Sequence, residues 1–203
     1  MKKIIKLILI ISVLSAMLPA LSSAGVKIGE LAPDFTLTDS NNQQRSLSEF
    51  AGKYIVLEWF NPECPFVRKH YDSGHMQGLQ VKYTARDVVW LSIDSSAEGN
   101  QGYLLPEDAN QFIKEENVSS TAVLLDPQGH VGKLYGAKTT PHMFIIDPQG
   151  KLVYQGAIDD IPSTDAGDVD SAKNYVDETL SLALSGGPVI SFATKSYGCS
   201  VKY

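Results

Sequence analysis

Two nearly continuous apolar runs constrain the fold of this 203-residue chain more than any other feature. They cover residues 54–60 and 88–93, and a mainly helical stretch, residues 65–86, separates them. A strand that is apolar at almost every position is expected to be buried on both faces, as in a parallel sheet covered by helices. We therefore expect a strand–helix–strand unit in an α/β protein.

The alternation continues in the second half of the chain and then changes. A helix is predicted over residues 106–117, a strand over 122–125 and a short helix over 131–135. Strands at 142–147 and 151–157 flank an Asp-Pro-Gln-Gly turn, which predicts an antiparallel hairpin. The complete pattern predicts a central mixed sheet with helices on both faces.

The two ends of the domain carry further elements. A short strand at 35–38 and the polar turn after it predict an N-terminal β-hairpin. Apolar residues recur at helical spacing over 168–184, which predicts an amphipathic helix. We expect one domain over residues 25–185, followed by a C-terminal tail, residues 186–203.

Residues 1–24 have the three regions of a secretory signal peptide. A basic start is followed by an apolar run and by small residues that end at Ala24, where cleavage is expected. The alternative is an uncleaved anchor, but the apolar run is short for a bilayer span of roughly 20 residues. We therefore expect a protein exported to the periplasm or the extracellular space, free of the membrane after cleavage. Disulfides persist in such an oxidising space.

Charge and cysteine content limit the partners. Loss of Lys2, Lys3 and Lys6 with the signal peptide takes the formal net charge from −6 to −9. An acidic surface without basic clusters argues against nucleic acid and anionic membranes as partners. The two cysteines, Cys64 and Cys199, allow a single bridge, either structural or redox-active.

Cys64 lies in the turn between the first apolar strand and the helix that Pro65 opens. Unpaired N–H groups at a helix N-terminus stabilise a thiolate, and Arg68 could add positive charge one turn later. The thiolate is the nucleophile in disulfide exchange, and a free cysteine has a pKa of about 8.5. The simpler alternative is a buried inert cysteine. Val67 occupies the position where a second cysteine would complete Cys-x-x-Cys.

A second motif, Thr139-Thr140-Pro141, directly precedes the strand that begins at His142. A proline that enters a strand cannot donate to the ladder, and a cis X-Pro bond is one way to make a sharp turn there. An ordinary trans proline at a strand start is the alternative.

Three stretches together resemble the thioredoxin superfamily, and more closely its redoxin branch of peroxiredoxin-like, AhpC/TSA-related proteins. They are Glu-Trp-Phe-Asn-Pro-Glu-Cys-Pro-Phe-Val at 58–67, Thr-Thr-Pro-His-Met-Phe-Ile-Ile-Asp at 139–147, and Gly-Cys-Ser-Val-Lys-Tyr at 198–203. The resemblance covers nearly all of the chain after the signal peptide. It implies a thioredoxin-like three-layer fold.

The resemblance also implies residue roles. Cys64 matches the attacking cysteine, Pro141 the cis-proline that faces it, and Glu58 a buried acid that moves protons. The backbone of Thr140 is expected to pair with a bound substrate strand. Residues expected to contact the partner lie in the two motifs: Pro65, Phe66, Thr140, Pro141 and His142.

Val67 departs from the family pattern, so a mixed disulfide on Cys64 has no neighbouring thiol to release it. Cys199 is the remaining candidate for the resolving cysteine, because a tail of about fifteen residues can extend to roughly 45 Å. A permanent structural disulfide, an intermolecular bridge and unpaired thiols stay open as alternatives.

These observations predict a thiol–disulfide oxidoreductase without a cofactor. Its expected partners are protein or small-molecule thiols and disulfides, and its expected state is a monomer or dimer. A thiol-dependent, antioxidant peroxidase is the first alternative, but Asn61 and Leu57 depart from the peroxiredoxin Pro-x-x-x-Thr/Ser-x-x-Cys pattern. The second is a copper- or haem-assembly binding protein, with His142 and His70 near Cys64. Scattered histidines are usually surface residues, so no metal site is predicted.

Overall fold

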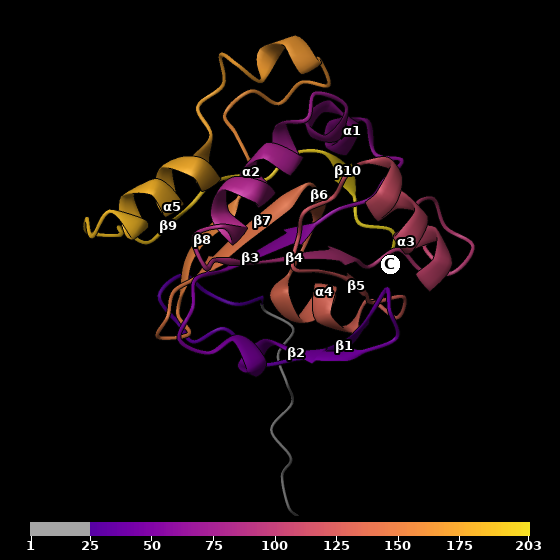
Figure 1. The fold of residues 1–203 in the computed structure, drawn as a ribbon, viewed down its shortest axis with the longest axis horizontal. Coiled ribbons are helices and arrows are strands. Elements are labelled where there is room, and N and C mark those ends of the chain that lie inside the picture. The colour runs from indigo at the N-terminus through magenta and orange to yellow at the C-terminus, as the bar shows by residue number, and fades with distance from the viewer. Residues whose placement is uncertain (1–24) are drawn as a thin grey trace, which may run out of the picture.

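The computed structural model describes residues 25–203, so the predicted signal peptide lies outside the described residues (Figure 1). Its centre is an eight-stranded sheet with the order β2-β1-β5-β4-β3-β7-β8-β9. The strands of this sheet are β1 (Thr36–Asp39), β2 (Gln44–Ser46), β3 (Ile55–Trp59), β4 (Val89–Asp94), β5 (Ala122–Leu125), β7 (His142–Ile146), β8 (Leu152–Gly156) and β9 (Phe192–Ala193). A separate pair joins β6 (Thr139–Thr140) to β10 (Cys199–Ser200).

The sheet is mixed, as the sequence predicts. Strands β3, β4 and β5 run parallel, and β7 pairs antiparallel with β3. The two expected hairpins are present, one formed by β1 and β2 and the other by β7 and β8. Every residue of β3 and β4 is buried, which explains why both runs are apolar along almost their whole length.

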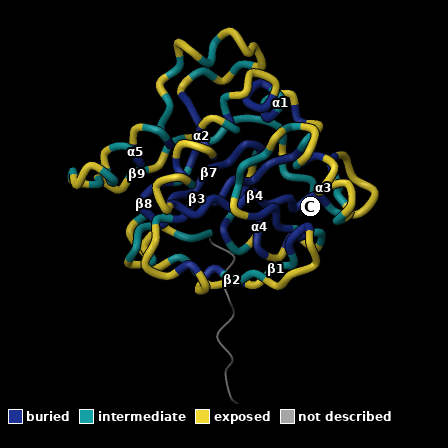
Figure 2. The backbone as a smooth tube through the Cα atoms, in the orientation of Figure 1, coloured by how far each residue is buried: buried dark blue, intermediate teal, exposed yellow. Residues whose placement is uncertain are grey.

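Helices cover both faces of the sheet (Figures 1 and 2). The helices are α1 (Pro65–Asp72), α2 (His75–Thr84), α3 (Pro106–Glu115), α4 (His130–Tyr135) and α5 (Tyr175–Leu184), with short 3₁₀ turns η1 (Leu47–Phe50) and η2 (Ala166–Asp168). One core contains side chains of α1, α2, α3 and α5. The second core, on the opposite face, contains those of α4 and η1. This is the expected three-layer arrangement.

The helix boundaries differ from the sequence expectation in two places. The stretch 65–86 divides at Gly74, whose φ of 73° ends one helix and starts the next. The predicted helix over 168–184 is wrong in its first part, because α5 begins only at Tyr175. The Asn174 side chain caps it by accepting the Asp177 N–H at 2.7 Å. The Lys173 N–H is bound to the Asp160 carboxylate instead of a helical carbonyl.

The C-terminal tail forms two short strands. Strand β9 adds in parallel to β8 at the edge of the sheet, and β10 pairs antiparallel with β6. In Figure 1 the yellow tail passes from β9 at one edge to β10, above the sheet. No helix within residues 25–203 is both long enough and apolar enough to cross a membrane.

Candidate active site

Cys64 is the N-cap residue of α1, and Pro65 occupies the first position of the helix. Buried strand β3 ends five residues earlier, so sheet and helix together fix the turn between them. The Cys64 carbonyl accepts the N–H groups of Val67 and Arg68 at 2.9 and 2.8 Å. Cys64 is fully buried, as is Val67, whose side chain packs into the core.

The sulfur of Cys64 faces the loop that precedes β7. The peptide bond between Thr140 and Pro141 is cis, and the Cys64 thiol donates to the Thr140 carbonyl at 3.1 Å. The Thr140 hydroxyl is buried and has no hydrogen-bond partner among the described residues. The hydroxyl is unpaired while Cys64 is a thiol, but it stabilises the thiolate and so lowers the pKa of Cys64, a feature that the sequence did not reveal.

Cys199 is brought to Cys64 by strand pairing, because it stands opposite Thr140 in the register of β10 and β6. Both cysteines are free thiols. Burial acts to raise the pKa of Cys64, but hydrogen bonds outweigh burial and hold this pKa below its ordinary value. The largest of these comes from the Cys199 thiol, followed by one from the Thr140 side chain.

The pKa of Cys199 moves the other way. Burial and its hydrogen bond to Cys64 raise the pKa of Cys199 to about 11. The two sulfurs therefore form an unequal pair, with the lower pKa at the helix N-terminus and the higher pKa on the tail.

Gly198 allows the tail to approach the cis-proline loop closely. Its φ is +127°, and a Cβ at this position would lie 2.0 Å from the Thr140 carbonyl oxygen. A side chain at position 198 is therefore excluded by sterics and by backbone conformation.

Two tyrosines anchor the tail on either side of Cys199. The Tyr197 hydroxyl donates to the Asp159 carboxylate, and its ring meets Phe66 edge-on at 5.8 Å between ring centroids. The Tyr203 hydroxyl donates to the Ala137 carbonyl at 2.8 Å. The Tyr203 ring lies so close to Gly129 and Gly132 that a Cβ at either would approach it within 2.3 and 2.6 Å.

The anchor of Tyr197 is itself held by a buried ion pair. Lys69 of α1 contacts the Asp159 carboxylate at 3.2 Å, and both side chains are almost completely buried. Lys69 also donates to the Ile161 carbonyl at 2.9 Å. Because removal of one partner would leave a buried charge unpaired, this pair ties α1 firmly to the loop beneath the tail.

Glu58 lies inside the core, on β3. Its carboxylate accepts four hydrogen bonds, from Tyr71, Gln80, Trp90 and Ser92. Burial raises the pKa of Glu58 despite these donors. No hydrogen bond joins Glu58 to Cys64 within residues 25–203, although both side chains border the same core.

Arg68 does not direct its charge at Cys64. Arg68 lies between two carboxylates, with Glu116 at 2.9 Å and Asp72 beside it, so its charge is balanced there instead of at the thiol. Pro65 is exposed and Phe66 is half-buried. His142 stands opposite Trp59 in the register of β7 and β3.

The histidines do not converge on Cys64. His70 is completely buried, contrary to the surface position expected for scattered histidines, and its Nδ1 lies 2.9 Å from Nδ1 of His75. Burial and the neighbouring His75 lower the pKa of His70 to about 3. His142 Nδ1 accepts the Lys138 N–H at 3.3 Å.

Asn61 fixes the turn before Cys64, a role that the sequence did not reveal. Its amide accepts the Glu63 N–H at 2.8 Å and donates to the Gln101 carbonyl at 2.9 Å. A Cβ at Gly102 would lie 2.2 Å from the Asn61 side chain. Gly102, in the polar loop after β4, is the one sequence feature that could have indicated this close contact.

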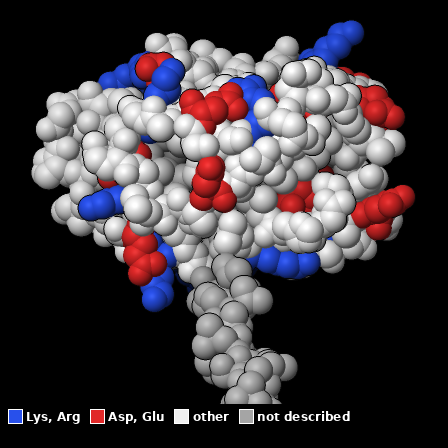
Figure 3. Space-filling view, turned by 90° about the horizontal axis from the view of Figure 1, so that it is seen from below, with Lys and Arg blue, Asp and Glu red and all other residues white. Residues whose placement is uncertain are grey.

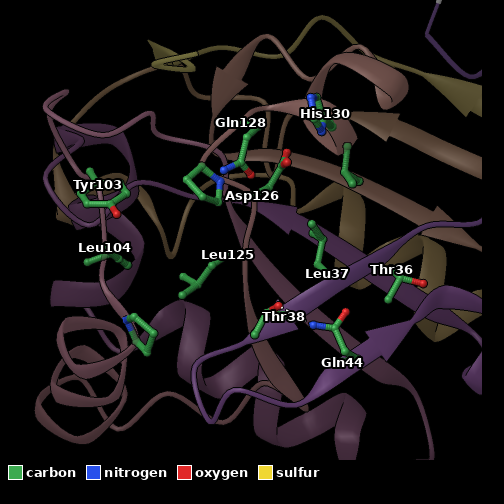
Figure 4. Close-up of a pocket in the computed structure, with 13 residues that line it drawn as sticks. Thr36, Leu37, Thr38, Gln44, Tyr103, Leu104, Leu125, Asp126, Gln128 and His130 are labelled. Carbon is green, nitrogen blue, oxygen red and sulfur yellow. Dashed lines mark hydrogen bonds between the residues drawn. The ribbon is translucent and has the colours of Figure 1, made fainter.

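A separate cavity of about 460 Å³ lies between β1, the loop before α3 and the start of α4 (Figure 4). Its lining includes Tyr103, Asp126 and His130 and neither cysteine. Asp126 is engaged by the Ser95 hydroxyl at 2.7 Å and the Gly132 N–H at 2.9 Å. This cavity is therefore distinct from the redox site.

The fold and the cysteine at a helix N-terminus facing a cis-proline define a thioredoxin-like protein of the redoxin type. The chain belongs to the AhpC/TSA family, which matches residues 28–155. The matched segment contains Cys64 and the cis-proline loop, whereas the tail with Cys199 lies beyond it.

Curated relatives include oxidoreductases and a peroxidase. The thiol-disulfide oxidoreductase ResA of Bacillus thuringiensis subsp. konkukian is 26% identical over 130 residues, covering 64% of this chain and 69% of its own. A thioredoxin peroxidase of Echinococcus granulosus is 30% identical over 153 residues, covering 66% and 72%. The chain is thus distantly related to both kinds of enzyme.

Solved structures confirm the fold. An uncharacterized conserved protein from Geobacillus kaustophilus has a TM-score of 0.72 at 26% identity, covering 87% of this chain and 92% of its own. A putative thiol:disulfide interchange protein DsbE from Chlorobium tepidum has a TM-score of 0.52 at 28% identity, covering 64% and 85%.

Proposed function

We propose that this protein is an exported thiol–disulfide oxidoreductase whose redox couple is Cys64 and Cys199. The observation that carries the proposal is the strand register that sets Cys199 opposite Thr140, where the two cysteines shift each other's pKa in opposite directions. The couple replaces the missing Cys-x-x-Cys with a cysteine from the tail.

In the reducing direction, the Cys64 thiolate attacks one sulfur of a substrate disulfide, whose S–S bond breaks. The departing thiolate takes a proton, and Cys64 is left in a mixed disulfide. Cys199 then loses its proton and attacks the Cys64 sulfur, which releases the second substrate thiol. Two electrons pass from the dithiol to the substrate, and the Cys64–Cys199 disulfide remains; the oxidising direction is the reverse.

The shift of the Cys199 pKa fits this order of events. The raised value depends partly on the hydrogen bond and charge of Cys64. Once Cys64 is in a mixed disulfide it carries no negative charge, so the pKa of Cys199 falls and its thiolate becomes available for attack.

Access requires movement of the tail. Cys64 is fully buried, and β10 occupies the edge of β6 where the resemblance places a bound substrate strand. We infer that β10 leaves this edge when a partner binds and returns to deliver Cys199. Thr140, Pro141, Pro65, Phe66 and His142 would then contact the partner, with the Phe66 face released by Tyr197.

Glu58 is proposed as the proton store of the site. The basis is its complete burial and raised pKa, which favour the protonated carboxyl. Arg68 is not proposed to lower the pKa of Cys64, because Glu116 and Asp72 balance its charge. A metal-binding function is likewise not proposed, since His70 pairs with His75 and His142 with the Lys138 backbone.

Peroxide reduction is the second candidate, favoured by the similarity to a thioredoxin peroxidase. It would use the same couple, with Cys64 cleaving the O–O bond. Asn61 stands where the peroxiredoxin pattern has Thr or Ser, and its amide is engaged by Glu63 and Gln101. We therefore rank disulfide exchange first.

The decisive experiment is mass mapping of the purified protein after a mild oxidant and again after dithiothreitol. We expect a Cys64–Cys199 bridge that forms and opens reversibly, and a persistent mixed disulfide on Cys64 in Cys199→Ser. If both thiols stay free after oxidation, the proposed couple is wrong. Peroxide consumption that depends on Cys64 and outpaces disulfide exchange would favour the second candidate.

A further inference from the structure

A cavity of about 730 Å³ opens beside the tail. The first described residues, the end of α4 and the strand before the cis-proline form part of its wall, and tail residues Thr194, Lys195 and Ser196 form another. Thr139 lines the cavity and pairs with Ser200, the residue after Cys199. The cavity therefore adjoins the strand that carries the second cysteine.

The charge of this cavity differs from that of the whole chain. Acidic residues outnumber basic ones, 23 to 17, yet the lining contains three lysines and no Asp or Glu. The lysines are Lys27, Lys138 and Lys195, all exposed. Of these three lysines, only Lys27 has a carboxylate of the described residues within ion-pair distance, that of Glu30 at 4.0 Å.

On the face drawn in Figure 3, acidic and basic side chains are interspersed among uncharged ones. A concave surface lined by one sign of charge raises the local concentration of the opposite ion. The cavity is thus suited to an anion although the net charge of the protein is negative.

His142 provides a hydrogen-bond donor in the wall of the cavity. His142 is only 6% exposed, yet it lines the cavity. Because Nδ1 accepts the Lys138 N–H, the ring proton belongs on Nε2. Within residues 25–203 the His142 ring makes one hydrogen bond, the one that Nδ1 accepts from Lys138, so the N–H at Nε2 remains available to a ligand.

The neutral form of this imidazole is favoured at physiological pH. Burial and the charge of Lys138 lower the pKa of His142 to about 4. A neutral ring with one N–H donates a hydrogen bond without adding charge. Ser196 adds a smaller polar side chain to the lining.

We propose that this cavity binds the carboxylate groups of a small anionic thiol or of its disulfide, and so selects the small-molecule partner of the redox couple. Lys27, Lys138 and Lys195 would attract the carboxylates, and the N–H of His142 would orient one of them. The selection of a redox partner rests on the proposed function, but binding of the anion can be tested separately.

Processing of the N-terminus would strengthen the site. If the chain is cleaved after Ala24, as the sequence predicts, the new α-amino group belongs to Gly25, which lines the cavity. An α-amino group has a pKa of about 7.7–8.0, so much of it would be charged at neutral pH.

Binding is tested without any redox step. S-methylglutathione carries two carboxylates and no reactive sulfur, and its dimethyl ester serves as the matched ligand control. We expect the diacid to shift the amide signals of Lys138, Thr139 and His142 in titrations followed by nuclear magnetic resonance, and the ester to shift them much less. Absence of these shifts at millimolar diacid, or shifts confined to another surface, would overturn the site whatever the cysteines do.

Selectivity is tested by the rate at which small disulfides oxidise the reduced protein. The probes are dianionic 5,5′-dithiobis(2-nitrobenzoate), uncharged 4,4′-dithiodipyridine and dicationic cystamine. In the triple variant Lys27→Gln, Lys138→Gln, Lys195→Gln, we expect a loss of about tenfold with the dianion, since exposed pairs contribute up to about fivefold each. The uncharged probe should react at an unchanged rate.

Lys53→Gln is the matched control, because Lys53 precedes β3 at the end of that strand away from Cys64 and pairs with Asp87. It removes one positive charge, as each substitution of the triple variant does, and should leave all three rates unaltered. A loss of about twofold with the dianion in the control, one third of the triple variant's tenfold loss on a logarithmic scale, would indicate only a net-charge effect and would refute the site. If no small disulfide yields a Cys64–Cys199 bridge but the diacid still binds, the proposed function fails and the anion site stands.

Discussion

Replacement of Gly198 by alanine should separate the tail from Cys64. Gly198 has a φ of +127°, and a Cβ there would lie 2.0 Å from the Thr140 carbonyl oxygen. This contact is with backbone, which cannot turn aside as a flexible side chain could. We therefore expect Gly198→Ala to break the pairing of β10 with β6 while the sheet and the helices keep their packing.

The size of the effect on Cys64 follows from its hydrogen bonds. Hydrogen bonding by the thiol and by the backbone of Cys199 lowers the pKa of Cys64. A hydrogen bond to a charged group contributes about 1.5–3 kcal/mol, and one pKa unit corresponds to about 1.36 kcal/mol. Release of the tail also hydrates the sulfur, which offsets part of the rise. We expect the pKa of Cys64 to rise by about one unit.

The assay is the rate of Cys64 alkylation by iodoacetamide as a function of pH, in a Cys199→Ser background and with Cys199 present. The midpoint of the profile reports the pKa, and the plateau at high pH reports access to the sulfur. Gly198→Ala should raise both, because the variant loses hydrogen bonds and uncovers a fully buried sulfur. In the Cys199→Ser background the shift of the midpoint should be smaller.

Gly186→Ala is the matched control. Gly186 also has a positive φ, 79°, but a Cβ there would meet nothing within 4 Å. It therefore tests backbone strain without the contact to Thr140. If Gly198→Ala leaves both the midpoint and the plateau unchanged, or if Gly186→Ala changes them equally, the reasoning about the tail is wrong.

Three further predictions concern the tail anchor and two buried carboxyl groups. Tyr203→Ala should lower the equilibrium constant for forming the Cys64–Cys199 bridge, measured against a glutathione buffer, by about tenfold. The variant loses the burial of the ring and one hydrogen bond, whereas Tyr203→Phe loses only the hydrogen bond and should have a smaller effect. Glu58→Gln should slow the resolving step in single-turnover measurements by about 10²-fold if Glu58 carries the proton, whereas a change below twofold would exclude that role. Burial raises the pKa of Asp94 from 3.8 to about 7. The contribution of Asp94 to stability is therefore complete at a pH below the ordinary pKa of an aspartate and is lost as the pH rises through 7. Denaturant unfolding should show Asp94→Asn flattening this decline, by about 4 kcal/mol at most.

Local chemistry made much of the fold predictable. The apolar runs at 54–60 and 88–93 became buried strands β3 and β4, because a strand with helices on both faces needs apolar residues on both. Pro65 opens α1 and Gly74 divides the helical stretch, as their backbone preferences require. The position of Cys64 at a helix N-terminus followed from the same local rules.

Competing local contacts explain the main error. Apolar spacing over 168–184 predicted one helix, but Asn174 provides a better cap and the Lys173 backbone binds Asp160. Periodicity records which residues are apolar and does not record which contacts distant loops offer. Arg68 has the same explanation. Its place in the sequence put it one turn from Cys64, but Glu116, which follows α3, forms an ion pair with it.

The sequence by itself determined the class of fold, the family and the identity of both cysteines, because these depend on spacing, turn residues and motifs within short segments. Only the tertiary structure decided that the tail sets Cys199 against Cys64, that two tyrosines and Gly198 hold it there, and that three lysines distant in sequence line one cavity. Long-range pairing and charge placement depend on how the segments meet in space, and local patterns carry little information about such contacts.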